Sequence, residues 1–144
     1  MSNAVFGPEE ATALVAHTFA PWVEEMGLRL VEGTPKQARL TLAANERLQL
    51  RGGPGVGVTC GQAIAAIADT SCVIALAAAN GRFRNCTTTD MSVRFIRPLM
   101  GAADVVVDIE SNGRKLAVCR VSVRAEGSEK TAALATATFM YLED

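Results

Sequence analysis

The chain has 144 residues, of which 49% are hydrophobic, 20% are charged and 5% are aromatic, and its formal net charge at pH 7 is −1. These values fit a single domain, residues 1–144, that is large enough to bury a substantial core. A charge this close to zero, without a block of like charges, gives no electrostatic footprint for nucleic acid or a membrane surface. We therefore expect neither of these as a partner.

The four cysteines, at positions 60, 72, 86 and 119, contain no Cys-X-X-Cys pair. With His17 as the single histidine they do not form a zinc-ligand pattern, so we expect no metal and no separate cofactor. No charged n-region followed by an apolar h-region opens the chain. These features predict reduced thiols and a cytoplasmic location.

A helix is predicted over residues 8–26. Pro8 suits the first turn of a helix, and the two acidic residues that follow it suit the positive end of the helix dipole. Pro21 predicts a bend in this helix, and Gly27 predicts its end.

Two short strands, 28–31 and 38–43, are predicted next because their residues alternate on either side of a Gly-Thr-Pro turn. The glycine-rich loop at 51–57 lacks the Gly-Lys-Ser/Thr ending of a phosphate-binding loop. Strand after strand follows it, whereas a dinucleotide-binding fold alternates strands with helices. The glycines are therefore interpreted as allowing a tight, irregular backbone path.

The most apolar segment, residues 61–79, is rich in alanine and contains no proline, which predicts a long helix. A helix that is apolar on nearly every side has to be buried. Asp69 lies in its middle, and a buried carboxylate is costly unless it is paired or used, because burial disfavours the charged form. Asp69 is therefore a structural hydrogen-bond acceptor, a surface residue on a helix that is less buried than its composition indicates, or a functional acid.

The helix is predicted to stop at Asn80-Gly81, and the remaining chain carries β-branched or alternating patterns. Four strands are predicted, over residues 87–97, 104–111, 116–125 and 132–142. Their short connections indicate an antiparallel meander. The complete order predicts an α+β fold in which one curved antiparallel sheet wraps around the buried 61–79 helix.

Two groups on this helix suit a chemical role. The N–H of Gly61 is unsatisfied at a helix N-terminus, so it can stabilise an oxyanion that develops on a carbonyl. Asp69 follows about 12 Å further along the axis, so one carbonyl cannot contact both groups of one helix. Two antiparallel helices across a twofold axis would place Gly61 of one beside Asp69 of the other. The spacing therefore predicts a site shared between subunits.

The stretch Cys60-Gly61-Gln62, followed by six residues and Asp69-Thr70, resembles a known helix signature. That signature, His-Gly-Gly-(six residues)-Asp, belongs to hotdog-fold acyl-CoA thioesterases of the phenylacetate-degradation type, which are 4-hydroxybenzoyl-CoA thioesterase-like. Residues 87–98 and 113–117 are similar to the strand and the hairpin that follow it. The resemblance implies a hotdog fold, a homodimer or dimer of dimers, and hydrolysis of an acyl-CoA. The products would be a carboxylic acid and free coenzyme A, which enters as part of the substrate.

Carried over residue by residue, the resemblance implies three catalytic positions. The Gly61 N–H holds the thioester oxygen, Asp69 of the partner subunit acts as general base or nucleophile, and Thr88 lies near the attacking water. The substrate-binding candidates by position are Cys60, Gln62, Thr70, Arg97, Arg114 and Lys115. The last three are candidates for the coenzyme A phosphates, with Arg82 and Arg84 behind them.

The sequence also departs from the signature. Cys60 replaces its His, Gln62 replaces its second Gly, and Pro54 stands where relatives often have Asn or Gln. These departures leave open a non-catalytic acyl-CoA-binding or sensing protein on the same fold. A hotdog hydratase is a third alternative, but it would require a histidine near the acid, and His17 is far from Asp69 in sequence. The acyl group, and the choice between dimer and tetramer, are left open as well.

Overall fold

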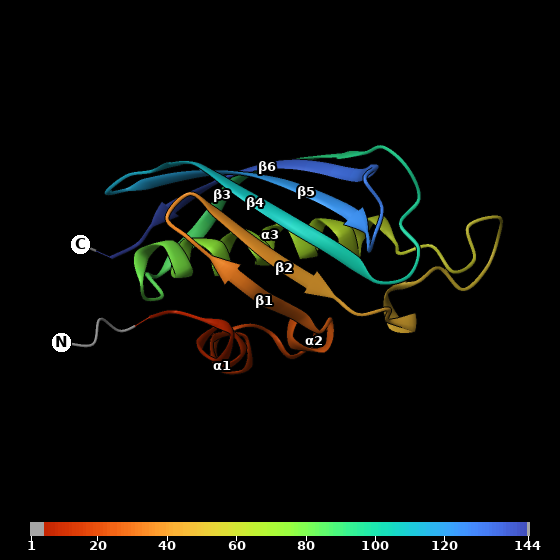
Figure 1. The fold of residues 1–144 in the computed structure, drawn as a ribbon, viewed down its shortest axis with the longest axis horizontal. Helices are drawn as coiled ribbons and strands as arrows, with labels where there is room; N and C mark the ends of the chain where they lie inside the picture. Colours follow the sequence, from red (N-terminus) through yellow and green to blue (C-terminus); the bar gives the residue numbers. More distant parts are fainter. Residues whose placement is uncertain (1–4, 144) are drawn as a thin grey trace.

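The computed structural model describes residues 5–143, which form one antiparallel sheet, a long central helix and short peripheral helices (Figure 1). The helices are α1 (Pro8–Thr18), α2 (Pro21–Glu25), the 3-10 helix η1 (Glu46–Leu48) and α3 (Gly61–Asn80). The strands are β1 (Leu28–Gly33), β2 (Gln37–Leu42), β3 (Cys86–Phe95), β4 (Ala103–Asn112), β5 (Leu116–Ala125) and β6 (Thr131–Tyr141). Their order in the sheet is β1-β2-β4-β5-β6-β3.

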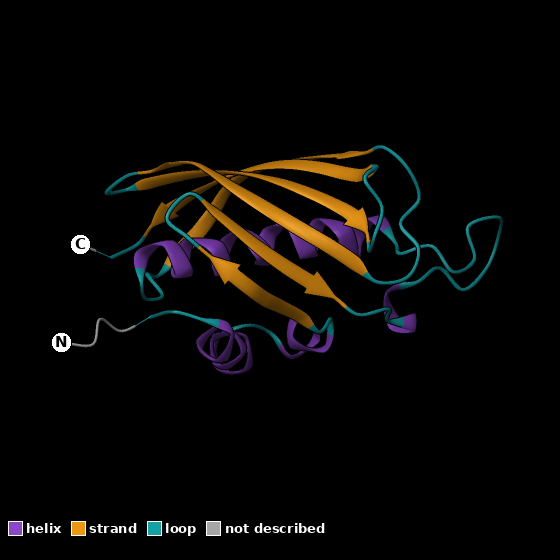
Figure 2. Ribbon diagram, in the orientation of Figure 1, coloured by secondary structure: helices purple, strands orange, loops and turns teal. Residues whose placement is uncertain are grey.

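The sheet curves around α3, as Figure 2 shows, and this arrangement confirms the predicted α+β hotdog fold. Alternate residues of each strand point toward the helix because successive side chains of a strand lie on opposite faces. The fully buried members on β4 and β5 are Ala103, Val105, Val107, Ala117, Cys119, Val121 and Val123. From α3, Ile67, Ile74 and Leu76 fill the space between them. Each such large side chain contributes about 1.5–3 kcal/mol by leaving water.

The ends of α3 agree with the prediction to within one residue. Gly81 has a φ of 74°, and its N–H donates to the carbonyl of Ala78 at 3.3 Å. Glycine adopts this left-handed conformation without strain, which explains why the helix stops there. A second glycine, Gly33 at the end of β1, permits close packing: a Cβ at Gly33 would lie 2.6 Å from the Cβ of Ala78.

The prediction of one bent helix over residues 8–26 is wrong. α1 ends at Thr18 and α2 begins at Pro21, and Phe19 and Ala20 between them have extended backbones. A proline pushes the residue before it out of the helical region, and it has no N–H to continue the helical ladder. The chain therefore breaks at this point, and Pro21 becomes the first residue of α2.

β3 is an edge strand. Among the described residues it pairs with β6 and with no other strand. It is 10 residues long, so its outer side leaves a long row of backbone N–H and C=O groups without strand partners. An open edge of this length favours pairing with a strand from another chain.

α3 is long and apolar enough to cross a membrane by composition alone, with a mean hydropathy of 1.7 over its most apolar window. In the structure the sheet wraps around this helix, and 61% of that window is buried. Its place in the core therefore accounts for its apolar composition.

Candidate active site

Asp69 on α3 and Thr88 on β3 form an exposed hydrogen-bonded pair. Asp69 is half-buried on α3, and its Oδ1 accepts a hydrogen bond of 2.6 Å from the Thr88 hydroxyl. Thr88 pairs with Phe139 of β6, and the buried Phe139 side chain lies on the helix-facing side of the sheet. The Thr88 side chain lies on the same side and therefore reaches Asp69. No other hydrogen bond to the Asp69 carboxylate occurs within residues 5–143. One carboxylate oxygen is thus fixed, and the other is available to a water or a substrate.

Thr88→Val keeps the shape of the side chain and removes the hydroxyl that orients Asp69. For the thioester hydrolysis predicted from the sequence, we expect kcat to fall about tenfold with KM changed by less than about twofold. A hydrogen bond to a charged group is worth roughly 1.5–3 kcal/mol, and we expect this one to act through the predicted catalytic carboxylate rather than through substrate binding. Steady-state thiol release measures both constants. Thr88→Ser should recover most of kcat, and equal losses in the two variants would contradict an orienting role.

The sheet leaves one stripe of α3 uncovered. Its members are exposed or half-buried: Gln62, Ala65, Ala66, Asp69 and Val73. Their spacing of three or four residues places them on one helix face. The expectation of a helix buried on every side is therefore wrong along this stripe. Asp69 is open to approach from outside the chain, and the alanines beside it leave room for a second helix to come close.

The N-terminus of α3 lines an apolar cavity of about 400 Å³. Its apolar walls are Leu50, Val58, Ile64, Phe95, Ile96, Pro98 and Leu99. The ring of Phe95 covers Gly61, since a Cβ on Gly61 would lie 3.4 Å from two of the ring carbons. The Gly61 N–H has no acceptor among residues 5–143, as expected for the first turn of a helix. A helix-terminal donor therefore borders an apolar space, where hydrogen bonds to developing charge are strong.

Gly61 and Asp69 do not form one site within a single chain. They are eight residues apart on the same helix, about 12 Å along its axis. Asp69 is also absent from the lining of the apolar cavity. The described chain therefore does not bring these two groups together, and the shared site stays a prediction.

The charge of Asp69 acts on two thiols, those of Cys72 and Cys86. Cys72 on α3 and Cys119 on β5 are fully buried, and a hydrogen bond with Cys119 raises the pKa of the Cys72 thiol well above its usual value. Burial raises the pKa of the half-buried Cys86 thiol, and the negative charge of Asp69 raises it further. Thiols with raised pKa values are poor nucleophiles at neutral pH. Within residues 5–143 no three His, Cys, Asp or Glu side chains gather in a way that could hold a metal ion.

Asp69→Asn should lower the pKa of Cys86, because it removes a negative charge that disfavours the thiolate. At pH 8 the thiolate fraction then rises, and we expect alkylation of Cys86 by iodoacetamide to accelerate about twofold or threefold. Mass spectrometry of the Cys86 peptide measures the rate, and the Cys60 peptide serves as internal control. Unchanged alkylation of Cys86 would mean that the Asp69 charge does not act on this thiol.

The other substrate-binding residues predicted on and near α3 lie in different surroundings. Cys60 and Arg97 line the apolar cavity together with Gly61. Gln62 is exposed at the start of the uncovered stripe. Thr70 is only 6% exposed and faces the core, so a substrate cannot reach it in the folded chain.

Arg114 and Lys115 lie far from the apolar cavity. They are exposed in the turn between β4 and β5, at the same end of the molecule as the C-terminus of α3 (Figure 1). Asn80, the last residue of α3, donates to Tyr141 and accepts from Asn112 at the base of this turn. The predicted phosphate-binding residues are thus divided between the two ends of α3, with Arg97 at one end and this turn at the other.

Sequence reasoning missed the walls of the cavity. Phe95 and Ile96 are 58% and 46% exposed, which is unusual for adjacent apolar side chains. A signal existed, because two consecutive apolar residues interrupt the alternation at the end of β3, directly before Arg97-Pro98. Leu50 carried no such signal, since it comes from a distant loop.

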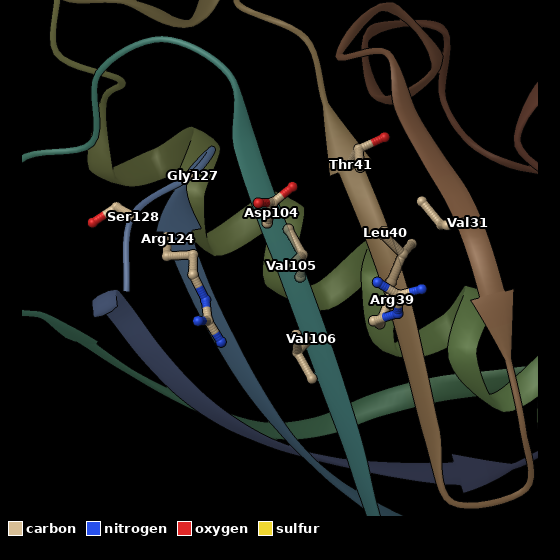
Figure 3. A pocket seen from close by; sticks show the side chains of 10 residues that line it. All are labelled: Val31, Arg39, Leu40, Thr41, Asp104, Val105, Val106, Arg124, Gly127 and Ser128. Carbon is tan, nitrogen blue, oxygen red and sulfur yellow. The ribbon is translucent and has the colours of Figure 1, made fainter. Parts of the chain in front are cut away.

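A second hollow, of about 300 Å³, lies on the face of the sheet opposite α3 (Figure 3). Arg39, Asp104 and Arg124 point into it from three neighbouring strands, and Arg39 is paired with Glu32 at 3.0 Å. Its mixed charges resemble an ordinary solvated sheet face, and the sheet separates it from Asp69.

The curved sheet, the central helix and the helix-terminal donor define a hotdog protein. A family model of the thioesterase superfamily matches residues 57–132, and the chain belongs to this superfamily, whose reaction is thioester hydrolysis.

A conserved protein of Pseudomonas aeruginosa is 26% identical, with a TM-score of 0.74 over 86% of this chain and 95% of that one. A thioesterase of Haemophilus influenzae is 18% identical, with a TM-score of 0.79 over 98% and 94%. Thioesterase superfamily member 2 of zebrafish is 17% identical, with a TM-score of 0.76 over 93% and 94%. No curated protein matches the chain in sequence.

Proposed function

We propose that the protein hydrolyses an acyl-CoA thioester with an apolar acyl group, giving a carboxylic acid and free coenzyme A. One observation carries this proposal. Two chemical groups lie on one helix. The Gly61 N–H has no acceptor among the described residues and borders an apolar cavity, and the Asp69 carboxylate accepts a hydrogen bond from Thr88 on the uncovered face of α3. An oxyanion donor and a carboxylate are the minimum that thioester hydrolysis requires, because a thiolate is a good leaving group.

The proposed active unit is a homodimer or a dimer of such dimers. The uncovered stripe on α3 and the open edge of β3 both support self-association. Antiparallel pairing of two β3 strands would extend the sheet and bring the two α3 helices together across a twofold axis. Gly61 of one subunit then lies beside Asp69 of the other, which offsets their separation of about 12 Å within one chain.

In the proposed reaction, the thioester oxygen accepts a hydrogen bond from the Gly61 N–H. Asp69 of the partner subunit removes a proton from a water, whose oxygen attacks the thioester carbon. The tetrahedral oxyanion forms at Gly61, where the N–H and the positive end of α3 stabilise it. The carbon–sulfur bond then breaks, and the proton held by Asp69 passes to the thiolate of coenzyme A. Direct attack by Asp69, through a transient anhydride, is the alternative for the same two residues.

The acyl group occupies the apolar cavity in this proposal. The cavity walls offer no charged partner except Arg97, whose guanidinium donates to the carbonyl of Thr131. A hydroxyl on the acyl group would lose its water in a cavity whose walls are mostly apolar, which costs about 1–3 kcal/mol when its hydrogen bond is left unmade. Unsubstituted aliphatic or aryl groups are therefore the expected substrates.

Thiol release from a panel of acyl-CoAs tests the proposed function. The panel pairs each apolar acyl group with a hydroxylated counterpart of similar size, such as benzoyl with hydroxybenzoyl. We expect release from the apolar members at higher kcat/KM. Binding of every member with release from none would reject the hydrolase and favour an acyl-CoA-binding protein on the same fold.

A further inference from the structure

The outer hollow, which lies on the face of the sheet opposite α3, contains two charged side chains without partners (Figure 3). The Arg124 side chain of β5 makes no ion pair or hydrogen bond within residues 5–143. The Asp104 carboxylate of β4 has no partner in this part of the chain either. Both residues are half-buried. Mixed charges are ordinary on a solvated sheet face, but charges that are withdrawn from water are usually paired.

Asp104 and Arg124 are direct neighbours across β4 and β5, yet they do not pair with each other. They are opposite in the strand register, and Thr41 of β2 is the neighbour of Asp104 on its other side. Figure 3 shows that the two side chains point apart, the carboxylate toward the side of Thr41 and the guanidinium away from it along β5. Opposite charges in this register normally attract each other. Their separation leaves an anionic and a cationic group beside one open space.

The Arg124 guanidinium is held in the outer hollow at a cost to stability. Its Nε is buried and has no acceptor among the described residues. An N–H in this position has lost its water without gaining a hydrogen bond. Methionine would fill the same space without this loss, so packing alone does not explain an arginine here. A polar group that is kept against stability is typical of a functional site.

The walls of the outer hollow supply further hydrogen-bond donors. The Nε of Arg39 on β2 donates to Glu32 at 3.0 Å, which leaves both Nη groups without a partner in the described chain. The Ser128 hydroxyl accepts from the Lys130 N–H at 3.1 Å, so its own hydrogen is free to donate. The space is about 300 Å³, which is at the lower end of the range for ligand sites. These dimensions suit a small polar molecule.

The charges of the outer hollow balance one another. Glu32 neutralises Arg39, and the remaining charges, on Arg124 and Asp104, are equal and opposite. A simple anion would be attracted by Arg124 and repelled by Asp104, and a simple cation would meet the reverse. A zwitterion offers each group its complement. A carboxylate suits the fork of N–H donors on a guanidinium, and an ammonium suits a carboxylate.

We infer that the outer hollow binds a small amino acid or another amino-carboxylate zwitterion. The ligand carboxylate contacts Arg124, and the ligand ammonium contacts Asp104. This inference does not depend on the proposed function, because the sheet separates the hollow from Asp69 and the ligand takes no part in thioester hydrolysis. It gives the outer face of the sheet a binding role of its own.

Titration calorimetry with a panel of small molecules tests the inference. Glycine, β-alanine and γ-aminobutyrate carry the two charges at increasing separation, while acetate, methylammonium and inorganic phosphate carry one kind of charge each. We expect at least one zwitterion to bind about tenfold or more tightly than every singly charged compound. Binding of none of the zwitterions, or equal binding of acetate or phosphate, would overturn the inference.

Two variants locate the binding in the outer hollow. Arg124→Met and Asp104→Asn should each weaken binding of the preferred zwitterion about tenfold or more, since each removes one charge-assisted contact. Arg120→Met is the matched control. It removes the same charge from an exposed position on the same strand and the same face, where Arg120 is paired with Glu110 at 3.3 Å. Equal affinity in Arg124→Met and the wild type would place the binding elsewhere and overturn the inference.

Thermal unfolding without ligand separates a binding role from a structural one. Arg124→Met should raise the thermal midpoint by about 2–4 °C, because it removes the unpartnered buried N–H. The double variant Asp104→Asn/Arg124→Met should show the sum of the two single shifts. A lower midpoint in Arg124→Met, or a clear departure from additivity, would mean that the two side chains pair with each other in solution. Either result would overturn the inference.

Discussion

Asp69→Asn is expected to reduce kcat for acyl-CoA hydrolysis by about a thousandfold, within the range of 10²–10⁴ for removal of a general base. The asparagine oxygen can still accept the Thr88 hydroxyl, so the hydrogen bond of 2.6 Å and the local packing are kept. The amide nitrogen, however, cannot take a proton from water, nor can the side chain form an anhydride. Thiol release at saturating acyl-CoA measures the loss.

Binding provides the control for this variant. Coenzyme A affinity and thermal midpoint should match the wild type, because Asp69 is half-buried and the substitution is nearly isosteric. Retention of more than about a tenth of kcat by Asp69→Asn would rule out this carboxylate as base or nucleophile. A large drop in thermal midpoint would show instead that Asp69 is mainly a structural acceptor.

Gly61→Pro is expected to lower kcat about 10²–10³-fold, because proline has no N–H to donate to the oxyanion. The substitution suits the backbone. Proline is favoured at the first position of a helix, and Cys60 before it already has the extended φ of −68° and ψ of 152° that a following proline requires.

Gly61→Ala is the matched control because it adds a Cβ and keeps the N–H. That Cβ would lie 3.4 Å from the Phe95 ring, and Phe95 is exposed enough to move. We expect it to retain activity within about tenfold of the wild type. Equal loss in the alanine and proline variants would assign the effect to crowding of the cavity rather than to the N–H.

Mixing the two inactive variants tests whether the site is shared. In a mixed dimer, Gly61 of the Asp69→Asn chain meets Asp69 of the Gly61→Pro chain, so one of the two sites is intact. After random subunit exchange about half the dimers are mixed, and activity should return to roughly a quarter of the wild-type value. No recovery, with mixed dimers detected by mass, would place both residues in one subunit's site.

The fold was predictable from sequence because its signals are local. The apolar run of α3 and the stop at Gly81 each depend on neighbouring residues. The break before Pro21 was missed although proline's effect on Ala20 is equally local. The position of β3 at the edge could not be derived, since strand order depends on contacts between distant segments.

The candidate site was predictable only where one helix carries it. Gly61 and Asp69 are related by the fixed rise of α3, so their separation follows from the sequence. The cavity walls come from two loops, a strand and a helix. No periodicity connects such residues, so the structure was needed to bring them together.

The uncovered stripe on α3 has a consequence for how the protein behaves when it is scarce. The uncovered stripe that would hold two subunits together also carries Asp69. Under the proposed function a lone protomer is fully folded yet inert, and catalytic capacity appears only as chains find each other. The total rate of hydrolysis would then rise faster than linearly with protein concentration, so that a modest change in expression could carry the protein across a threshold of activity.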